Sequence, residues 1–263
     1  LGRGGWYHVS HFSVSFKLLF KIDELEVNAM IHIITDSTCD ISPQQQKELG
    51  IEILPLTVHF QQESFLDGVE LSPAAFYQKL SQATELPTTS QISPGVFTEV
   101  FQKYINQGDQ VVGIFISSHL SGTFQSAVMA KEMVGSEEIY LVDSLNATLG
   151  LALLVLQAAD LRQQGKSAPE IFAELTAIVP KVRLLAAVDT LKYLKMGGRL
   201  STITAVMGGI LGISPVIAII DGKVEAIGKA KGRKAAFQLM ANRIKELPAD
   251  NRYPISFGHS DAP

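Results

Sequence analysis

Two short segments combine several hydroxyl side chains with the expected start of a helix. They are residues 88–94, with the sequence TTSQISP, and residues 117–123, with the sequence SSHLSGT. The first turn of a helix leaves backbone N–H groups unpaired and carries a partial positive charge, so neighbouring hydroxyl donors complete a site for a carboxylate or a phosphate. Ordinary N-capping explains either segment alone. Two such segments in one chain favour an anion-binding site.

The second segment follows the apolar run 111–116, which predicts a buried strand. Open α/β sheets bind ligands beyond the carboxyl ends of their strands, where this segment would lie. A serine hydrolase is the competing interpretation, because Ser121, His119 and Asp143 all fall near expected strand ends. Ser121 lacks the Gly-x-Ser-x-Gly turn of many hydrolases, and His119, two residues away, would have to fold back awkwardly. Binding is therefore favoured over hydrolysis.

Residues suited to metal or nucleotide chemistry are scattered. The six histidines form no HExxH pattern, and Cys39 has no second thiol beside it. The glycine-rich segment 208–212 lacks the Lys-Ser/Thr pair that binds phosphate and magnesium in a Walker loop. No metal or cofactor is therefore expected. Cys39, the only cysteine, follows an apolar strand and is expected to be a buried structural thiol, which fits a reducing cytoplasm.

The composition excludes several classes of protein. The chain has 263 residues, of which 46% are hydrophobic and 18% charged, and a formal net charge of −4. A nucleic-acid-binding protein usually carries a basic surplus, so nucleic acid is not an expected partner. Charges or glycines interrupt every apolar run before the roughly 18–20 residues of a membrane span. A cytoplasmic protein is expected, with apolar surface available to bind an apolar ligand or a partner, or to contact a membrane transiently.

Two groups of basic residues have alternative interpretations. The run 229–234, KAKGRK, is typical of a solvated surface, but it would also suit docking of an acidic partner or a phosphate. Arg199 lies between Gly198 and Leu200 in a turn-rich stretch. An arginine in such a turn is solvated by default, yet its guanidinium can also bind a phosphate through two hydrogen bonds.

The positions of these residues depend on an alternation of strands and helices from Met30 onward. Expected strands cover 31–35, 51–60, 111–116 and 139–142, and expected helices cover 43–50, 94–106, 121–134 and 147–164. Residues 61–87 are expected to be an excursion with a helix at 73–82. Four successive strand–helix units predict an α/β fold, with a parallel sheet and helices on both of its faces.

The second half has a different pattern and predicts a second, α+β domain. A helix is expected at 168–180 and a strand at 184–188, and Asp221-Gly222 between two apolar runs predicts a β-hairpin. The expected domains are therefore an N-terminal extension, 1–29, an α/β domain, 30–166, and an α+β domain, 167–263.

The two ends of the chain carry expectations of their own. Met30, just before a clean strand, is the expected natural start. Residues 255–259 are typical of a strand followed by a turn. A chain that stops at Pro263 is therefore expected to lack the last elements of the second domain.

A set of short motifs occurs along the chain in a fixed order. They are Asp36-Ser37-Thr38-x-Asp40, Thr89-Ser90-Gln91-x-Ser93-Pro94, Leu120-Ser121-Gly122-Thr123-x-x-Ser126-Ala127, Val142-Asp143-Ser144, Leu194-x-x-Gly197-Gly198-Arg199, Gly212-x-x-Pro215-Val216 and Asp221-Gly222. Each is weak alone, but the ordered set is specific. It resembles the DegV family of bacterial fatty-acid-binding proteins from about Ile31 to the C-terminus.

The resemblance implies a carrier rather than an enzyme. Members of the family hold a long-chain fatty acid and present its carboxylate to a separate, ATP-dependent fatty acid kinase subunit, which forms an acyl phosphate for phospholipid synthesis. The matching motifs imply hydrogen bonds to the carboxylate from Thr89 and Ser121, with Ser90, Gly122 and Thr123 in the same turns. The acyl chain would run between the two domains.

The resemblance also implies a role for Arg199, which matches the arginine of the family's Gly-Gly-Arg motif and is a candidate for contact with the kinase subunit or with the phosphoryl group. Two features depart from the family pattern. Ile92 stands where the family usually has proline. The family continues to a His-x-Gly-Pro-Gly segment whose histidine joins the carboxylate network, and His259 does not match it. Two alternatives stay open: a stand-alone serine hydrolase or acyltransferase that uses Ser121, and a lipid-sensing protein without a kinase link.

Overall fold

The computed structural model describes residues 29–200, 213–246, 250 and 252–259. The interpretations of residues 1–28 and of the glycine-rich segment 208–212 therefore lie outside the described residues. The first half of the chain forms β1 (Ile31–Asp36), η1 (Ser37–Cys39), α1 (Pro43–Leu49), β2 (Ile51–Leu54), β3 (Thr57–Phe60), β4 (Glu63–Leu66), α2 (Pro73–Gln82), β5 (Thr88–Ser90), α3 (Pro94–Ile105), β6 (Gln110–Phe115) and α4 (Thr123–Val134). The second half forms β7 (Ile139–Asp143), α5 (Thr148–Gln163), α6 (Ala168–Ile178), η2 (Val179–Lys181), β8 (Leu184–Ala187), α7 (Lys192–Met196), β9 (Ile213–Ile220), β10 (Lys223–Lys231) and α8 (Gly232–Glu246).

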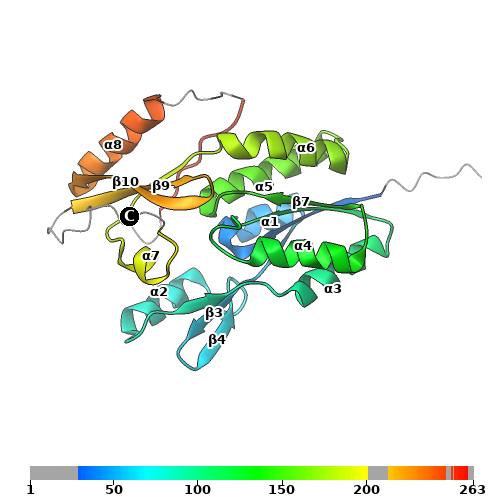
Figure 1. Cartoon of the computed structure of the whole chain (residues 1–263), viewed down its shortest axis with the longest axis horizontal. Helices are drawn as coiled ribbons and strands as arrows, with labels where there is room; N and C mark the ends of the chain where they lie inside the picture. Colours follow the sequence, from blue (N-terminus) through cyan, green and yellow to red (C-terminus); the bar gives the residue numbers. More distant parts are fainter. Residues whose placement is uncertain (1–28, 201–212, 247–249, 251, 260–263) are drawn as a thin grey trace, which may run out of the picture.

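A parallel sheet in the order β2-β1-β6-β7 forms the centre of the molecule (Figure 1). Its middle strands are buried on both faces, as their continuous apolar runs predict. On one face, Leu151 of α5 packs with Ile33 and Val112. On the other face, Phe97 and Phe101 of α3 belong to the second core. The predicted α/β fold, with helices on both faces of a parallel sheet, is confirmed.

Helix α6 lies beyond the predicted domain boundary at residue 166, yet it packs on the parallel sheet. Its buried residues Ile171 and Leu175 join the same core as α5. This packing places α6 in the first unit of the fold, which comprises the elements from β1 to α6. The second unit comprises β8, α7, β9, β10 and α8.

The single strand predicted at 51–60 is wrong. Pro55 interrupts it, because proline offers no N–H to a sheet ladder, and the chain forms β2 and β3 instead. Strand β3 leaves the parallel sheet and becomes the centre of an antiparallel sheet in the order β4-β3-β5. Val58 and Phe60 pack toward Phe76 of α2, which occupies its predicted place at 73–82. The predicted excursion is therefore a small sheet backed by a helix.

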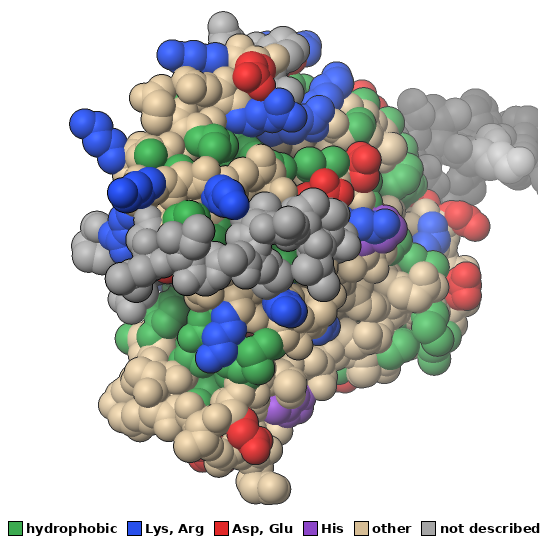
Figure 2. Space-filling view, turned by 60° about the vertical axis from the view of Figure 1, so that its left-hand side comes forward, with side chains coloured by type: hydrophobic (Ala, Val, Ile, Leu, Met, Phe, Trp, Pro, Cys, Tyr) green, Lys and Arg blue, Asp and Glu red, His purple; other side chains and the backbone are tan. Residues whose placement is uncertain are grey.

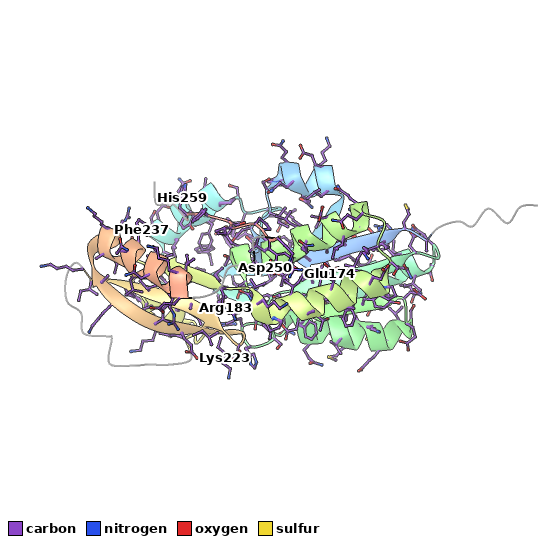
Figure 3. The ribbon with its side chains drawn as sticks, turned by 90° about the horizontal axis from the view of Figure 1, so that it is seen from above. Glu174, Arg183, Lys223, Phe237, Asp250 and His259 are labelled. Carbon is purple, nitrogen blue, oxygen red and sulfur yellow. The ribbon has the colours of Figure 1, made fainter. Side chains whose placement is uncertain are left out.

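The second unit is an antiparallel sheet in the order β10-β9-β8, covered by α8. Asp221 and Gly222 join β9 to β10 with positive φ angles of 47° and 79°, so the predicted hairpin is confirmed. The basic run at 229–234 is divided between two elements, because β10 continues to Lys231 and α8 begins at Gly232. Figure 3 shows this sheet and α8 at one end of the molecule, with Lys223 of β10 and Phe237 of α8 labelled.

The strand predicted at 255–259 is not formed. Residues 254–259 have no helix or strand and run over the first unit. Tyr253 packs on the core of α5 and α6, and a Cβ added at Gly258 would lie 3.0 Å from Leu149 Cδ1. The segment therefore lies against α5 instead of extending a sheet.

The second unit contacts the carboxyl end of the parallel sheet through the β9–β10 turn. Ser117 Oγ, just beyond β6, donates a 2.8 Å hydrogen bond to Gly222 O. A Cβ added at Gly222 would lie 2.6 Å from Ser117 Oγ and 2.7 Å from His119 Cδ2. Beside this contact lies an apolar cluster that draws on both units, with buried members Ile116, Ala147, Leu191, Ile217, Ile219 and Val224.

At the opposite, amino end of the sheet, Asp109 ties two strands together. Its Oδ1 accepts from Met30 N at 3.0 Å, and its Oδ2 lies 2.8 Å from His32 Nε2. The imidazole of His32 stacks on Tyr104, with ring centroids 3.7 Å apart. The hydrogen bond from His32 holds the pKa of Asp109 below its ordinary value.

We predict that Gly222→Ala destabilises the protein more than a glycine substitution at the same backbone angle elsewhere. Gly108 is the matched control, because its φ is 80° and a Cβ there meets nothing within 4 Å. Gly108→Ala should cost only the left-handed strain of about 1–2 kcal/mol. Gly222→Ala should add the displacement of Ser117 and His119. Equal melting temperatures for the two variants would contradict this contact.

We predict that Asp109→Asn lowers the melting temperature at neutral pH by about 2–4 °C, the equivalent of about 1 kcal/mol for one hydrogen bond in a domain of this size. Because the folded-state pKa of Asp109 is depressed, its contribution is complete above its unfolded pKa and is lost as the pH falls through the folded value. The difference between variant and wild type should therefore shrink below about pH 4. The exposed Glu132→Gln is the control. A difference that stays constant down to pH 2 would count against this assignment.

Candidate functional site at the carboxyl end of the parallel sheet

A buried carboxylate, Asp36, joins the ends of the two central strands. Its Oδ2 accepts from Ile116 N at 2.7 Å, and its Oδ1 accepts from Thr38 N at 3.0 Å and Thr38 Oγ1 at 2.6 Å. The side chain is fully buried. Burial raises the pKa of Asp36, and these hydrogen bonds oppose the rise. Asp36 thus fixes where the chain leaves β6 for the second hydroxyl segment.

The second hydroxyl segment, 117–123, forms a compact turn ahead of α4. The N–H groups of Leu120 and Ser121 both donate to Ser117 O, at 2.9 and 3.1 Å. Ser121 Oγ lies 2.9 Å from Thr123 Oγ1 and accepts from Thr123 N at 3.3 Å. Helix α4 begins at Thr123, two residues later than predicted. Its N-cap residue is Gly122, which has no side chain to accept a hydrogen bond from the first turn.

The start of α4 therefore keeps backbone donors available. Within the described part of the chain, no side chain accepts a hydrogen bond from the N–H groups of Phe124 or Gln125. The hydroxyls of Ser121 and Thr123 border these donors. Such donors suit an anion, and the binding of an anion here stays a prediction.

The first hydroxyl segment leads into α3 at the predicted residue, but its first three residues form a strand that was not predicted. Thr88–Ser90 form β5 and pair with β3. Helix α3 begins at Pro94, with Ser93 as its N-cap accepting from Val96 N at 3.4 Å. Proline at the first helical position favours this start, which is the predicted one, while the β-branched threonines suit the strand.

The strand geometry separates the two candidate residues Thr89 and Ser90. Neighbouring side chains of a strand point to opposite faces. Ser90 Oγ lies 2.7 Å from His59 Nε2, and His59 Nδ1 lies 2.8 Å from Ser64 Oγ. Sequence reasoning missed His59, although the alternation of apolar and polar residues at 57–60 is a signal for one polar strand face.

Gln91 brings the two hydroxyl segments together. Its Nε2 donates to Ser126 Oγ in α4 at 2.8 Å. Its amide also lies against the Cα of Gly122, since a Cβ added there would be 2.7 Å from Gln91 Cδ and closer still to Oε1. The loop that carries Thr89 is therefore anchored to the turn that carries Ser121.

Arg199 reaches the same turn from the second unit. Its Nε donates to Leu120 O at 3.2 Å, and its Nη1 donates to Gly197 O at 2.6 Å. The residue is exposed. The structure thus gathers Arg199 and the 117–123 turn at one place, although they are far apart in the sequence.

The contacts of Asp143 and Ser121 do not form a hydrolase triad. Asp143 Oδ1 accepts from the backbone N–H groups of Ser118 and Leu145, at 3.2 and 3.1 Å. Ser121 Oγ contacts Thr123, and the His119 ring lies beside Gly222. Among the described residues, His119 therefore has no hydrogen bond to either side chain.

Other chemistry is limited in the described residues. They contain no group of three or more His, Cys, Asp or Glu side chains that could hold a metal ion. Cys39 is buried as expected, and burial raises the pKa of its thiol to about 12. Neither length nor apolar character suits any of the described helices to crossing a membrane.

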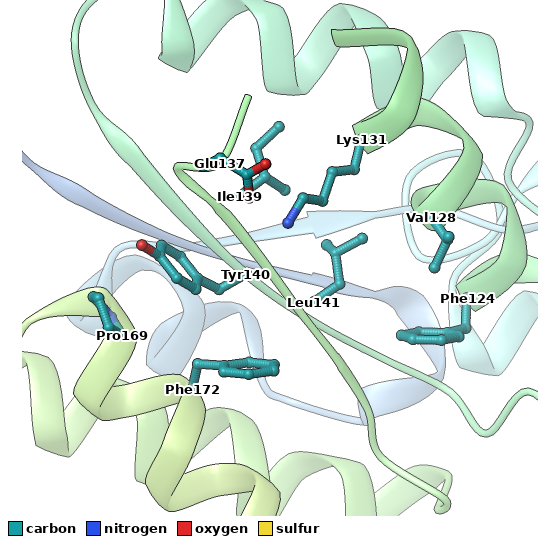
Figure 4. Close-up of a pocket in the computed structure, with 9 residues that line it drawn as sticks. All are labelled: Phe124, Val128, Lys131, Glu137, Ile139, Tyr140, Leu141, Pro169 and Phe172. Atoms are coloured by element: carbon teal, nitrogen blue, oxygen red, sulfur yellow. The ribbon is translucent and has the colours of Figure 1, made fainter. Parts of the chain in front are cut away.

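A separate groove runs beside the edge strand β7, between α4 and α6 (Figure 4). It is mainly apolar, with Lys131 and Glu137 at its rim. Its other lining residues are Phe124, Val128, Ile139, Tyr140, Leu141, Pro169 and Phe172. None of the predicted anion-binding residues lines it, so the groove and the hydroxyl segments are distinct places.

Comparison with known proteins shows clear relatives. Residues 30–263 match the family model described as "Uncharacterised protein, DegV family". A DegV domain-containing protein of Caldanaerobacter subterraneus is 39% identical over 220 residues, which cover 84% of this chain and 78% of the relative. One from Clostridium acetobutylicum is 38% identical over 216 residues, covering 82% of this chain and 77% of the relative.

Solved structures show the same fold. A DegV family protein from Thermus thermophilus, described as binding fatty acid, has a TM-score of 0.76 and 33% identity, covering 83% of this chain and 78% of its own. A stearic acid-binding protein from Eubacterium ventriosum has a TM-score of 0.76 and 31% identity, covering 82% and 78%. The family match over residues 30–263 and the identity to these relatives lead to one conclusion: the chain belongs to the DegV family.

Proposed function

We propose that this protein binds a long-chain fatty acid and holds its carboxylate at the two hydroxyl segments. One observation carries the proposal: Gln91 anchors the first segment to the uncapped start of α4, where Ser121 and Thr123 border free N–H groups. A carboxylate suits such donors because it accepts several hydrogen bonds and its charge is favoured at a helix N-terminus. The fatty acids bound by relatives of similar fold support this choice of anion.

Within this proposal, the carboxylate contacts come from Thr89, Ser121 and Thr123, together with the backbone at Gly122. Ser90 takes a supporting role, because its hydroxyl already pairs with His59. Thr89 points to the opposite face of β5 from Ser90, because neighbouring side chains alternate along a strand.

The acyl chain would follow the apolar cluster where the two units meet. Leu120 links this cluster directly to the 117–123 turn, and Leu194 of α7 packs against it from the second unit. Each buried methylene contributes about 0.8 kcal/mol. A long chain therefore supplies most of the affinity, while the hydroxyl segments select the acidic head group.

The second part of the proposal is that the protein presents the bound carboxylate to an ATP-dependent kinase subunit, which phosphorylates it. Lys and Arg greatly outnumber Asp and Glu in residues 181–246, although the whole chain has a net charge of −4. Figure 2 brings the second unit toward the viewer and shows many Lys and Arg side chains in the upper half of the view. This surface suits an acidic partner. Arg199 belongs to this basic stretch and contacts Leu120 in the 117–123 turn of the proposed site.

We predict that the purified protein carries one fatty acid per chain and that Ser121→Ala weakens binding. Removal of a hydrogen bond to a charged group costs about 1.5–3 kcal/mol, or about 10- to 150-fold in affinity. Native mass spectrometry with lipid extraction measures the first quantity, and competition with a fluorescent fatty acid measures the second. Ser256→Ala, an exposed serine far along the chain, is the control. Unchanged affinity in Ser121→Ala would contradict the proposed site.

We predict that Arg199→Ala lowers acyl phosphate formation by about tenfold when a cognate kinase and ATP are supplied, because a guanidinium can pair with a phosphoryl group. Fatty acid affinity should change much less. Arg199 donates its hydrogen bonds to the backbone carbonyls of Leu120 and Gly197, and the proposed carboxylate contacts come from other residues. Arg183→Ala, an exposed arginine of the same basic stretch (Figure 3), is the matched control. Fatty acid binding without any acyl phosphate would favour a lipid-binding protein that has no kinase link.

A further inference from the structure

The contact between Gln91 and Gly122 explains a glycine that the backbone itself does not require. Gly122 has φ −74° and ψ 2°, angles that other residues adopt without strain. A Cβ at this position would nevertheless lie 2.7 Å from Gln91 Cδ and 3.0 Å from Gln91 Nε2. The glycine is therefore required by the approach of one side chain.

The far end of Gln91 is held equally firmly. Its Nε2 donates to Ser126 Oγ at 2.8 Å, and Ser126 is only 1% exposed. Ser126 lies one turn into α4, so Gln91 grips the first turn of this helix at Gly122 and at Ser126. A side chain held at two points transmits the position of its own backbone to its partner.

The contacts of Gln91 also constrain the segment before it. Thr89 lies two residues before Gln91, in β5, and pairs with Val58 of β3. Because the backbone joins Thr89 to Gln91, the contacts of Gln91 with α4 set the separation between Thr89 and Ser121.

We propose that Gln91 is a positioning residue that sets this separation to fit a carboxylate, and that Gly122 is the complementary residue which makes room for it. The head-group part of this inference rests on the proposed fatty acid site. The Gln91–Gly122 coupling does not, because it follows from contacts in the protein alone.

The coupling is tested by suppression of a clash. Gly122→Ala should lower the melting temperature by several degrees, because the new Cβ overlaps the Gln91 amide. Gln91→Ala in the same chain should restore most of that loss, since it removes the overlapping atoms. Gln163→Ala, at an exposed glutamine of α5, should restore nothing. Additive losses in the Gly122→Ala/Gln91→Ala variant would overturn the coupling.

The head-group part is tested by comparing a fatty acid with the fatty alcohol of the same chain length. In the wild type the acid should bind more tightly than the alcohol. Gln91→Ala should reduce affinity for the acid by about tenfold and leave affinity for the alcohol nearly unchanged. Gln163→Ala should change neither. A merely structural role would weaken both ligands equally, and that result would overturn the positioning role.

The two failures are distinguishable. If the wild type binds neither ligand, the proposed function and the head-group role both fall, while the melting experiment still decides the coupling. If the wild type binds the acid and Gln91→Ala keeps full preference for it, the proposed function stands and the positioning role of Gln91 falls.

Discussion

The buried carboxylate of Asp36 is the constraint on which the rest of the site depends. An ionised carboxyl away from water is costly unless donors surround it, and Asp36 accepts from Ile116 N and from both donors of Thr38. These bonds hold the ends of β1 and β6 side by side. After β1, Ser37 Oγ accepts from Leu56 N and so fixes the entry to the small β4-β3-β5 sheet. After β6 come the 117–123 turn and α4. Asp36 therefore fixes the points at which the chain leaves β1 toward the small sheet and leaves β6 toward the 117–123 turn.

The second unit contacts the same end of the parallel sheet, in part through the β9–β10 turn. Gly222 fits against Ser117 and His119 because it has no side chain and adopts a positive φ. Arg199 adds a second contact at Leu120, and the apolar cluster beside Ile116 buries the space between the units. The proposed carboxylate donors, the apolar path and the exposed arginine thus meet at the carboxyl end of the parallel sheet. Each unit contributes part of the arrangement, so the site depends on how they dock.

Features determined by local sequence were predictable, and features determined by distant partners were not. The apolar runs at 31–35 and 111–116 predicted buried strands, and Asp221-Gly222 predicted its hairpin, because strand burial and turn geometry are written in neighbouring residues. The strand at 51–60 was wrong, since only the pairing of β3 with β4 and β5 shows that it leaves the main sheet after Pro55. The placement of Thr89 and Ser90 in a strand has the same origin. The contact of Gln91 with Gly122 joins residues 31 positions apart, and no periodicity in the sequence reveals it.

A crystal structure of the protein grown with a long-chain fatty acid would locate the carboxylate and the acyl chain. We expect the carboxylate to lie within hydrogen-bonding distance of Ser121 Oγ and Thr89 Oγ1, with the acyl chain passing Leu120 toward the cluster around Ile116. A fatty acid bound in the groove beside β7, with its carboxylate at Lys131, would contradict this expectation.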